Sequence, residues 1–343
     1  MTTGDKSGSE WPQHGSQPRV AILILNWNGI RDTLETLESV QQLQYSNFEV
    51  VLVDNGSTDG SREAIATAFP TVRLIAPPTN LGVAGGRNLG LEAILRQPDV
   101  DYVLFLDNDV TLEPSLLDKL VAEANKDAAL GIVGPIVYYH SDPRRIWSAG
   151  SRFIFREVIS QLRLKNHPVT HELMEGIEYV DALSGCCMLV KRCVFETIGY
   201  FTPHYFMVCD DSEFCYRAAK VGFKRGVVMH ARLWHKVSAS TDGGYTPGRA
   251  YFTGQSTILF LKAHGRFRQW ASSLTCVALS LPIAYLREWR RGNQRAVVMK
   301  FRGYMDGLLD RPIDPQIERY FQPGQSGPVD EVHVRRGAAD RPA

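Results

Sequence analysis

The first 125 residues alternate between short apolar runs and stretches with helical spacing. Four runs predict strands buried on both faces, at 20–25, 48–53, 72–75 and 102–106. Between them, apolar residues recur three or four positions apart. This spacing predicts helices over 31–40, 61–69, 88–96 and from Pro114 to about Asn125, with a loop over 77–86. Strands that alternate with helices pair in parallel through right-handed crossovers, so the pattern predicts an α/β fold with a mostly parallel sheet flanked by helices.

The rest of the chain is less regular. Short apolar runs predict strands at 131–137 and 187–190, and 212–220 has the pattern of a helix. We expect one catalytic-type domain over 20–244, followed by a helical, basic region over 245–312. The polar segments 1–19 and 313–343 are predicted to be loose tails, and the first lacks the apolar core of a secretory signal.

Composition narrows the class of protein. With 44% hydrophobic and 22% charged residues, the 343-residue chain is globular, which excludes a disordered or collagen-like protein. Its 38 basic and 37 acidic residues give no overall attraction to nucleic acid, so we expect no such partner. Five of the six cysteines fall between 186 and 215 without a CxxC pair, which favours free thiols in a reducing cytoplasm over a structural zinc site.

Polar clusters directly follow three of the predicted strands. Asn26 and Asn28 follow the first strand, Asp54 and Asn55 the second, and the segment 107–109 the fourth. Ligands of such sheets bind beyond the carboxyl ends of the strands, so these clusters are expected at one edge. Asp54 and Asn55 have the groups to bind a nucleobase or ribose, while the neighbouring 57–59 also suit a helix N-cap.

Asp107 and Asp109 are the first candidate metal ligands. Residues two apart in an extended stretch project the same way, so both carboxylates can share one Mg²⁺ or Mn²⁺ ion. A plain turn at the strand end is the alternative, because Asp and Asn are favoured there.

A glycine-rich segment and an acidic segment supply further candidates. The stretch 80–90 contains Arg87, whose guanidinium suits a phosphate, but it does not match a GxGxxG loop. Asp210, Asp211 and Glu213 place three carboxylates within four residues. Their repulsion would raise at least one pKa, as a general base requires; an acidic helix N-terminus is the alternative reading.

The roles of two further side chains, His235 and Trp147, remain open at this point. His235 is a candidate metal ligand or phosphate contact, although a single histidine is more often structural. Trp147 could stack on a sugar ring, with a place in the core as the favoured alternative.

The order of these motifs from about 20 to 240 resembles glycosyltransferase family 2. This is the inverting GT-A fold, and the closest likeness is to its bacterial rhamnosyltransferase-like branch. Seven segments carry the resemblance: 24–28, 53–59, 80–82 with 87–90, 106–109, 184–186, 206–217 and 235–238.

The resemblance implies both a reaction and a set of site residues. A sugar, rhamnose in this branch, would pass from a nucleotide-diphosphate donor such as dTDP-rhamnose to a glycan or lipid-linked acceptor, in cell-surface polysaccharide synthesis. Asp211 would be the catalytic base. The remaining roles are these: nucleotide binding by Asn26, Trp27, Asn28, Asp54, Asn55, Gly82, Arg87 and Asn108; Mn²⁺ or Mg²⁺ binding by Asp107, Asp109 and His235; acceptor binding by Trp147, Gly185, Cys186, Asp210 and Glu213.

The chain departs from the family pattern at two places. Asp210-Asp211 stands where a Glu-Asp pair is usual, and Glu213 stands where an Asp is usual. Asp54-Asn55 replaces two acids after the second strand.

Two other functions are alternatives to a transferase. A sugar nucleotidyltransferase usually has a GxGxRL-type loop after its first strand, which 26–30 lacks, and a non-catalytic glycan- or membrane-binding protein would not need all of these carboxylates.

The basic region over 245–312 suggests a partner of its own. Between 262 and 302 there are nine Lys/Arg and one acid, Glu288, a net charge of +8. The 18 uncharged residues between Arg268 and Arg287 are marginal for a membrane-spanning helix. They favour a helix lying on the anionic inner surface of the membrane, so we expect a peripheral location there; a packed helix of a soluble tail is the alternative. The sequence leaves a homo-oligomer open.

Overall fold

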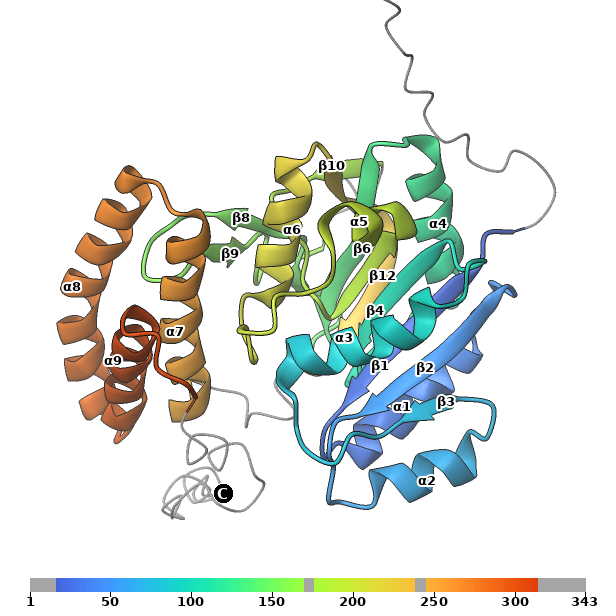
Figure 1. The fold of residues 1–343 in the computed structure, drawn as a ribbon, viewed down its shortest axis with the longest axis horizontal. Helices are drawn as coiled ribbons and strands as arrows, with labels where there is room; N and C mark the ends of the chain where they lie inside the picture. Colours follow the sequence, from blue (N-terminus) through green and yellow to red (C-terminus); the bar gives the residue numbers. More distant parts are fainter. Residues whose placement is uncertain (1–16, 170–175, 238–244, 314–343) are drawn as a thin grey trace, which may run out of the picture.

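The computed structural model describes residues 17–169, 176–237 and 245–313, and Figure 1 shows their arrangement. Most of the two predicted tails, and Ser238 of the last family motif, lie outside the described residues.

A mixed ten-stranded sheet forms the centre of the molecule. Across it the strands run in the order β10-β12-β6-β11-β4-β1-β2-β3, with short β5 attached to β12 and β7 to β6. Their bounds are β1 Val20–Asn26, β2 Phe48–Asp54, β3 Arg73–Ile75, β4 Tyr102–Asp107, β5 Val110–Leu112, β6 Leu130–Tyr139, β7 Ile146–Ser148, β10 Ile177–Tyr179, β11 Cys187–Lys191 and β12 Lys224–His235. A separate hairpin pairs β8 Ser151–Phe153 with β9 Ser160–Leu162.

The expected parallel pairing is confirmed for β1 with β2 and β4, for β2 with β3, and for β6 with β12. The sheet is less parallel than expected, because β5, β7 and β10 pair antiparallel with their neighbours. Strand β11 also runs antiparallel, between β4 and β6. Its amino-terminal end therefore meets the carboxyl ends of β1, β2 and β4 at one edge. In that register Asn26 pairs with Asp54, Leu25 with Asp107, and Leu106 with Cys187.

Helices cover both faces of the sheet (Figure 1). On one face lie α1 Ile30–Gln41, α2 Ser61–Ala68 and α4 Leu116–Lys126, and on the other α3 Gly82–Leu95, α5 Arg192–Ile198 and α6 Asp210–Lys220. The period of two along β1 explains this arrangement, because Val20, Ile22 and Ile24 join the first core while Ala21 and Leu23 join the second. The continuous apolar runs of the sequence are thus strands buried on both sides.

In the glycine-rich segment, the predicted start of the helix is wrong. We expected a loop over 77–86 and a helix from Asn88, but α3 begins at Gly82. The glycines let the helix approach the sheet closely: a Cβ on Gly86 would lie 2.4 Å from Leu25 Cδ1, and one on Gly90 would lie 2.3 Å from Leu23 Cδ1. Packing against β1 therefore outweighs the low helix propensity of glycine.

Three further helices follow the sheet: α7 Pro247–His264, α8 Phe267–Trp289 and α9 Gln294–Leu308. Backbones of α7 and α9 touch where they cross. A Cβ on Gly254 would lie 2.2 Å from the carbonyl oxygen of Lys300, and a Cβ on Gly303 would lie 2.0 Å from that of Tyr251. Helix α8 packs on α9 and lies at the outer edge of the molecule (Figure 1).

Because α7 and α9 cross so closely, one added methyl group at the crossing should lower the stability of the fold. Gly303→Ala should lower the free energy of unfolding by about 1–3 kcal/mol, because overlap with a backbone carbonyl outweighs the ~1 kcal/mol that alanine gains in helix propensity. Urea unfolding measures this difference. Val298→Ala, at an exposed position of the same helix, should change it by less than about 0.5 kcal/mol. Equal stability of the two variants would contradict the close crossing.

Candidate active site

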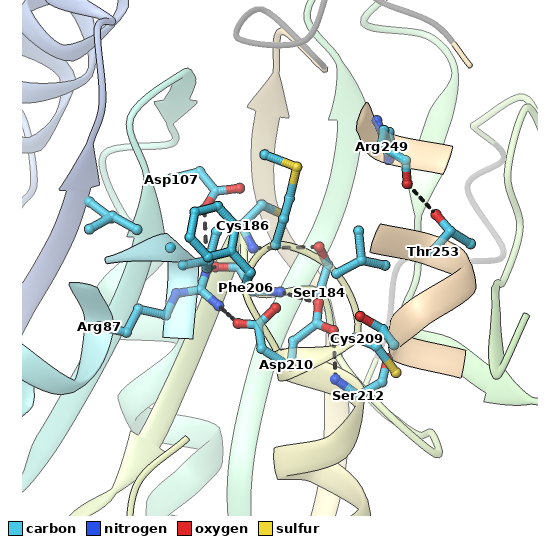
Figure 2. Close-up of a pocket in the computed structure, with 18 of the residues that line it drawn as sticks. Arg87, Asp107, Ser184, Cys186, Phe206, Cys209, Asp210, Ser212, Arg249 and Thr253 are labelled. Carbon is cyan, nitrogen blue, oxygen red and sulfur yellow. Dashed lines mark hydrogen bonds and ion pairs between the residues drawn. The ribbon is translucent and has the colours of Figure 1, made fainter. Parts of the chain in front are cut away.

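A cleft of about 470 Å³ opens at the edge of the sheet where the polar clusters meet. Its volume is in the usual range for a small-molecule site. One wall comes from the ends of β1, β2, β4 and β12, from the start of α3 and from the start of α6. The opposite wall comes from the β8–β9 hairpin and from α7. Figure 2 shows Arg87, Asp107 and Asp210 on the first wall and Arg249 with Thr253 on the second.

Asp107, Asp109 and His235 converge on the first wall. One potential ligand atom from each lies within 4.8 Å of the other two, and His235 Nε2 is 3.0 Å from Asp109 Oδ1. Antiparallel pairing of Val110 with His235 draws β12 against the segment that follows β4. The two aspartates were expected to converge through an extended stretch; they converge instead across a turn at Asn108 and Asp109.

This cluster has the properties of a divalent-cation site. Burial raises the pKa of Asp107 above its ordinary value, with Arg87 opposing and Asp109 adding to the rise. Burial would lower the pKa of His235, but the hydrogen bond with Asp109 and the negative charges of Asp109 and Asp107 together outweigh this and raise it. His235 Nδ1 is buried and has no hydrogen-bond partner among the described residues. Two carboxylates and an imidazole fit Mn²⁺ or Mg²⁺ with open positions for phosphate oxygens.

Arg87 is buried behind the cluster and binds three oxygens. Its Nη1 donates to Asp210 Oδ2 at 2.7 Å, and its Nη2 donates to Asp107 Oδ1 at 3.3 Å and to the carbonyl of Gly185 at 2.9 Å. The guanidinium also lies over the rings of Phe105 and Phe201, at 5.7 and 5.6 Å. We expected the guanidinium of Arg87 to bind a phosphate. In this structure its N–H groups instead bond to protein oxygens and position two carboxylates.

Asp211 lies in the first turn of α6 and lines the cleft. Its Oδ2 accepts a hydrogen bond from the backbone N–H of Gly185 at 2.9 Å, which directs the carboxylate. The preceding Cys209 has a φ of 73°, a left-handed conformation that bends the chain into the helix. Burial raises the pKa of neighbouring Asp210, Arg87 opposes this effect, and Asp211 reinforces it.

Glu213, predicted on the acceptor side, is not among the residues that line the cleft. Its carboxylate is buried and accepts from Arg217 Nε at 2.9 Å and lies 3.0 Å from His264 Nε2. Burial would raise the pKa of Glu213, but the hydrogen bonds with His264 and Arg217 and the positive charges of these two residues together lower it. Since His264 belongs to α7, Glu213 links α6 to α7.

The predicted nucleotide residues divide into two groups. Trp27, Asn55, Gly82, Arg87 and Asn108 line the cleft. Asn26, Asn28 and Asp54 are not among its lining residues.

The second group supports the turn after β2. Buried Asp54 accepts from Asn26 Nδ2 at 2.8 Å and from the N–H of Ser57 at 3.0 Å. Asn28 Oδ1 accepts from the N–H of Thr58 at 2.7 Å. These bonds assign Asn26, Asn28 and Asp54 to shaping the wall behind Asn55.

Most of the predicted acceptor-binding residues line the cleft. Gly185 and Cys186 line the cleft, and so does Trp147, which meets the His235 ring edge-on at 4.7 Å between centroids. Gly185 allows no side chain, because a Cβ there would lie 2.5 Å from Arg87 Nη1.

Sequence reasoning missed the wall formed by α7. Arg249, Thr253, Ser256 and Thr257 line the cleft from this helix. Their spacing of four, three and one residues puts them on one helix face, a signal that could have revealed a polar stripe.

The model of the family described as "Glycosyl transferase family 2" matches residues 21–199, more than half of the chain. The chain belongs to glycosyltransferase family 2. An N-acetylglucosaminyl-diphospho-decaprenol L-rhamnosyltransferase of Mycobacterium tuberculosis is 30% identical over 210 residues, covering 56% of this chain and 67% of the relative. The low-salt glycan biosynthesis hexosyltransferase Agl10 of Haloferax volcanii is 25% identical over 210 residues, covering 60% of this chain and 64% of the relative.

Solved structures support the expected fold of this glycosyltransferase. GalNAc-T7 with UDP, GalNAc and Mn²⁺ superposes with a TM-score of 0.56 at 16% identity, covering 71% of this chain and 48% of that one. The mannosyltransferase PcManGT from Pyrobaculum calidifontis, in complex with GDP-Man and Mn²⁺, gives 0.51 at 17% identity, covering 87% and 89%. The expected α/β fold of the GT-A type, with helices after it, is confirmed.

Removal of the Arg87 guanidinium should destabilise this glycosyltransferase strongly. Arg87→Met leaves Asp210 and Asp107 buried without their cation, which should cost about 3–5 kcal/mol in the free energy of unfolding. Urea unfolding at neutral pH is the measurement. Arg31→Met is the matched control, because its side chain is 90% exposed and forms only a surface pair with Glu35. If both variants lose the same small amount, Arg87 does not hold the site together.

Binding of Mn²⁺ should stabilise the folded enzyme through the Asp107–Asp109–His235 cluster. At about a hundredfold excess over the dissociation constant, the gain should be about 2.7 kcal/mol. Thermal unfolding with and without Mn²⁺ measures it, and Asp109→Asn or His235→Ala should remove most of the gain. Glu113→Gln, a carboxylate paired with Lys119 just beyond β5, should keep it. An undiminished gain in Asp109→Asn would exclude the cluster as the ion site.

Proposed function

We propose that this family member is an inverting, metal-dependent transferase. It would move a sugar from a nucleotide-diphosphate donor to a hydroxyl of a glycan or lipid-linked acceptor in the synthesis of cell-surface polysaccharide. One observation carries the proposal: the directed carboxylate of Asp211 lines the same cleft as the Asp107–Asp109–His235 cluster. A base and a cation site are the two groups that such a displacement needs.

The first wall of the cleft suits the donor. Asp107, Asp109 and His235 would hold the divalent ion, which supplies positive charge to the diphosphate as it leaves. Trp27 offers an aromatic face and Asn55 a side-chain amide for the nucleoside, both at the cleft surface. The complexes of GalNAc-T7 with UDP and Mn²⁺ and of PcManGT with GDP-Man and Mn²⁺ support a donor of this chemical class.

Asp211 would take the proton from the acceptor hydroxyl. The acceptor oxygen then bonds to the anomeric carbon, the bond from that carbon to the diphosphate breaks, and the electron pair leaves with the nucleotide diphosphate. A single displacement from the opposite face inverts the anomeric centre. The hydrogen bond from the Gly185 N–H keeps the carboxylate of Asp211 oriented for this step.

The second wall suits the acceptor. Thr253, Ser256 and Thr257 on α7 line the cleft beside Arg249. The hydroxyls of Thr253 and Thr257 donate to carbonyls of α7, which leaves their oxygens as acceptors. Hydroxyls bind the hydroxyls of a glycan, and a guanidinium suits a phosphate that links a glycan to a lipid. The Mycobacterium tuberculosis relative is named for rhamnose and for an acceptor on a lipid diphosphate. We therefore propose rhamnose as the transferred sugar, with dTDP-rhamnose as the donor to test first.

Replacement of Asp211 should separate binding from chemistry. Asp211→Asn keeps the size of the side chain but cannot accept the proton, so the rate of sugar transfer should fall about 10²–10⁴-fold. The apparent affinity for the donor, measured from its thermal stabilisation of the protein, should remain within about twofold of the wild-type value. The measurement is release of nucleotide diphosphate from dTDP-rhamnose with an isoprenoid-diphosphate glycan as acceptor and Mn²⁺ present, and NMR of the product gives the anomeric configuration.

Asp142→Asn is the control, because this exposed carboxylate pairs with Arg145 outside the cleft. It should leave the rate unchanged. Full activity of Asp211→Asn would remove the proposed base, and retention of the anomeric configuration would refute the single displacement. Release of pyrophosphate from a nucleoside triphosphate and a sugar phosphate would instead indicate a nucleotidyltransferase.

A further inference from the structure

Exposed apolar side chains are concentrated on α8, α9 and the residue that follows them. Among the described residues, 16 large hydrophobic side chains are exposed, and 12 of these lie between 267 and 309. They are Phe267, Leu274, Leu279, Ile283, Tyr285, Leu286, Trp289, Val298, Phe301, Met305, Leu308 and Leu309. Such a concentration marks an interaction surface and not scattered surface residues.

The outward face of α8 is a continuous apolar stripe. Leu279, Ile283, Leu286 and Trp289 recur at three- and four-residue spacing and are 67%, 68%, 59% and 63% exposed. The opposite side of the helix packs on the protein through other residues, namely Trp270, Val277 and Leu281. Hence α8 has two apolar faces, of which only one has a partner in this chain.

Helix α9 repeats this arrangement. Val298, Phe301, Met305 and Leu308 follow the same three- and four-residue spacing and are exposed. Ala296 and Met299 are buried on its other side. Because α8 contacts α9 directly, the two helices together form what we call the α8–α9 face.

The charges around this face are mostly positive. The exposed Asp310, which follows Leu309, pairs with Lys262. Between 262 and 302 the single acid is Glu288, which is 3% exposed and bonded to Arg287, so the acid does not reach the surface. Arg268 lies near the first turn of α8 and Arg290 directly follows its last residue, and both are exposed. The apolar stripe thus runs between two exposed cations.

We propose that the α8–α9 face docks on an anionic lipid surface, with α8 lying in the headgroup region parallel to the membrane. Apolar side chains enter the acyl boundary in this mode while flanking arginines bind lipid phosphates. A second copy of the chain fits less well, because a two-fold contact would place the arginines of both copies against each other. Among the described residues no helix is long and apolar enough to cross a membrane, so α8 does not meet the requirements of a spanning helix.

This docking gives the cleft access to a lipid-linked acceptor. Helix α7 lines the cleft with one face and packs on α9 with another, through Gly254 against Lys300. Only this step rests on the proposed function; the lipid contact itself can be measured without any transferase assay.

Binding to vesicles tests the proposal directly. The full chain should float with vesicles of phosphatidylglycerol and phosphatidylcholine and only weakly with phosphatidylcholine alone. Arg268→Gln with Arg290→Gln should lower the partition coefficient on the anionic vesicles about 25-fold, roughly fivefold for each arginine. Ile283→Ser with Leu286→Ser should lower it at least tenfold.

Two matched controls should leave partitioning unchanged. Val221→Ser removes an apolar side chain that is 53% exposed away from α8, and Arg31→Gln removes an exposed cation from α1. Thermal unfolding should show that every variant folds like the wild type, because all four α8-region positions are exposed.

Three outcomes would overturn the proposal: no binding of the wild type to anionic vesicles, equal binding to neutral vesicles, or unchanged binding of both double variants. If Ile283→Ser with Leu286→Ser instead converted a dimer to a monomer on size exclusion without affecting vesicle binding, the face would be an interface between copies. These results are separate from loss of transfer in Asp211→Asn, so docking and transferase activity can fail independently.

Discussion

The buried guanidinium of Arg87 reconciles a concentration of negative charge with a folded protein. Four carboxylates, of Asp107, Asp109, Asp210 and Asp211, line one cleft, and Arg87 bonds to two of them from behind. Without this cation, burial and mutual repulsion would favour protonation of the acids or opening of the site. Arg87 also accounts for Gly185, since any side chain there would overlap the guanidinium. The same glycine then directs Asp211 through its backbone N–H.

This arrangement divides the acids into two sets with different electrostatic needs. Asp210 has its charge offset by Arg87 at 2.7 Å, and Asp107 has a longer bond of 3.3 Å to the same residue. Asp109 has only the imidazole of His235 for a partner in the cluster. Apart from Asp211, the charge that Arg87 leaves uncompensated therefore lies on the side of the cleft where Asp107, Asp109 and His235 converge. A divalent cation is the group that such an excess binds best, and a diphosphate is what it would then attract.

The sequence predicted the elements that depend on local pattern. Apolar runs identified β1, β2 and β4 as strands buried on both faces, and polar residues at their ends identified the edge where the site lies. Other features depend on contacts across the fold. The start of α3 was misplaced because its glycines pack on Leu23 and Leu25, which no local pattern reveals. Asp54 and Arg87 had the right chemistry for a ligand, but partners distant in sequence occupy their polar atoms. Glu213 does not line the cleft, because its carboxylate contacts His264, which lies 51 residues further along the chain.

The helices after the sheet are connected to Asp211, the proposed catalytic base, through a short series of contacts. Glu213 is two residues from Asp211 on α6, and its contact with His264 fixes the end of α7 against that helix. Backbone contacts at Gly254 and Gly303 then fix α9 against α7, and α8 packs on α9. The steps from α6 to α9 are a buried hydrogen bond and two backbone contacts, which resist sliding, and side-chain packing adds α8. The apolar stripe of α8 therefore has a fixed position relative to Asp211. A surface that binds this stripe would hold the cleft at one height and orientation above it, which matters if the acceptor hydroxyl is attached to a lipid in that surface.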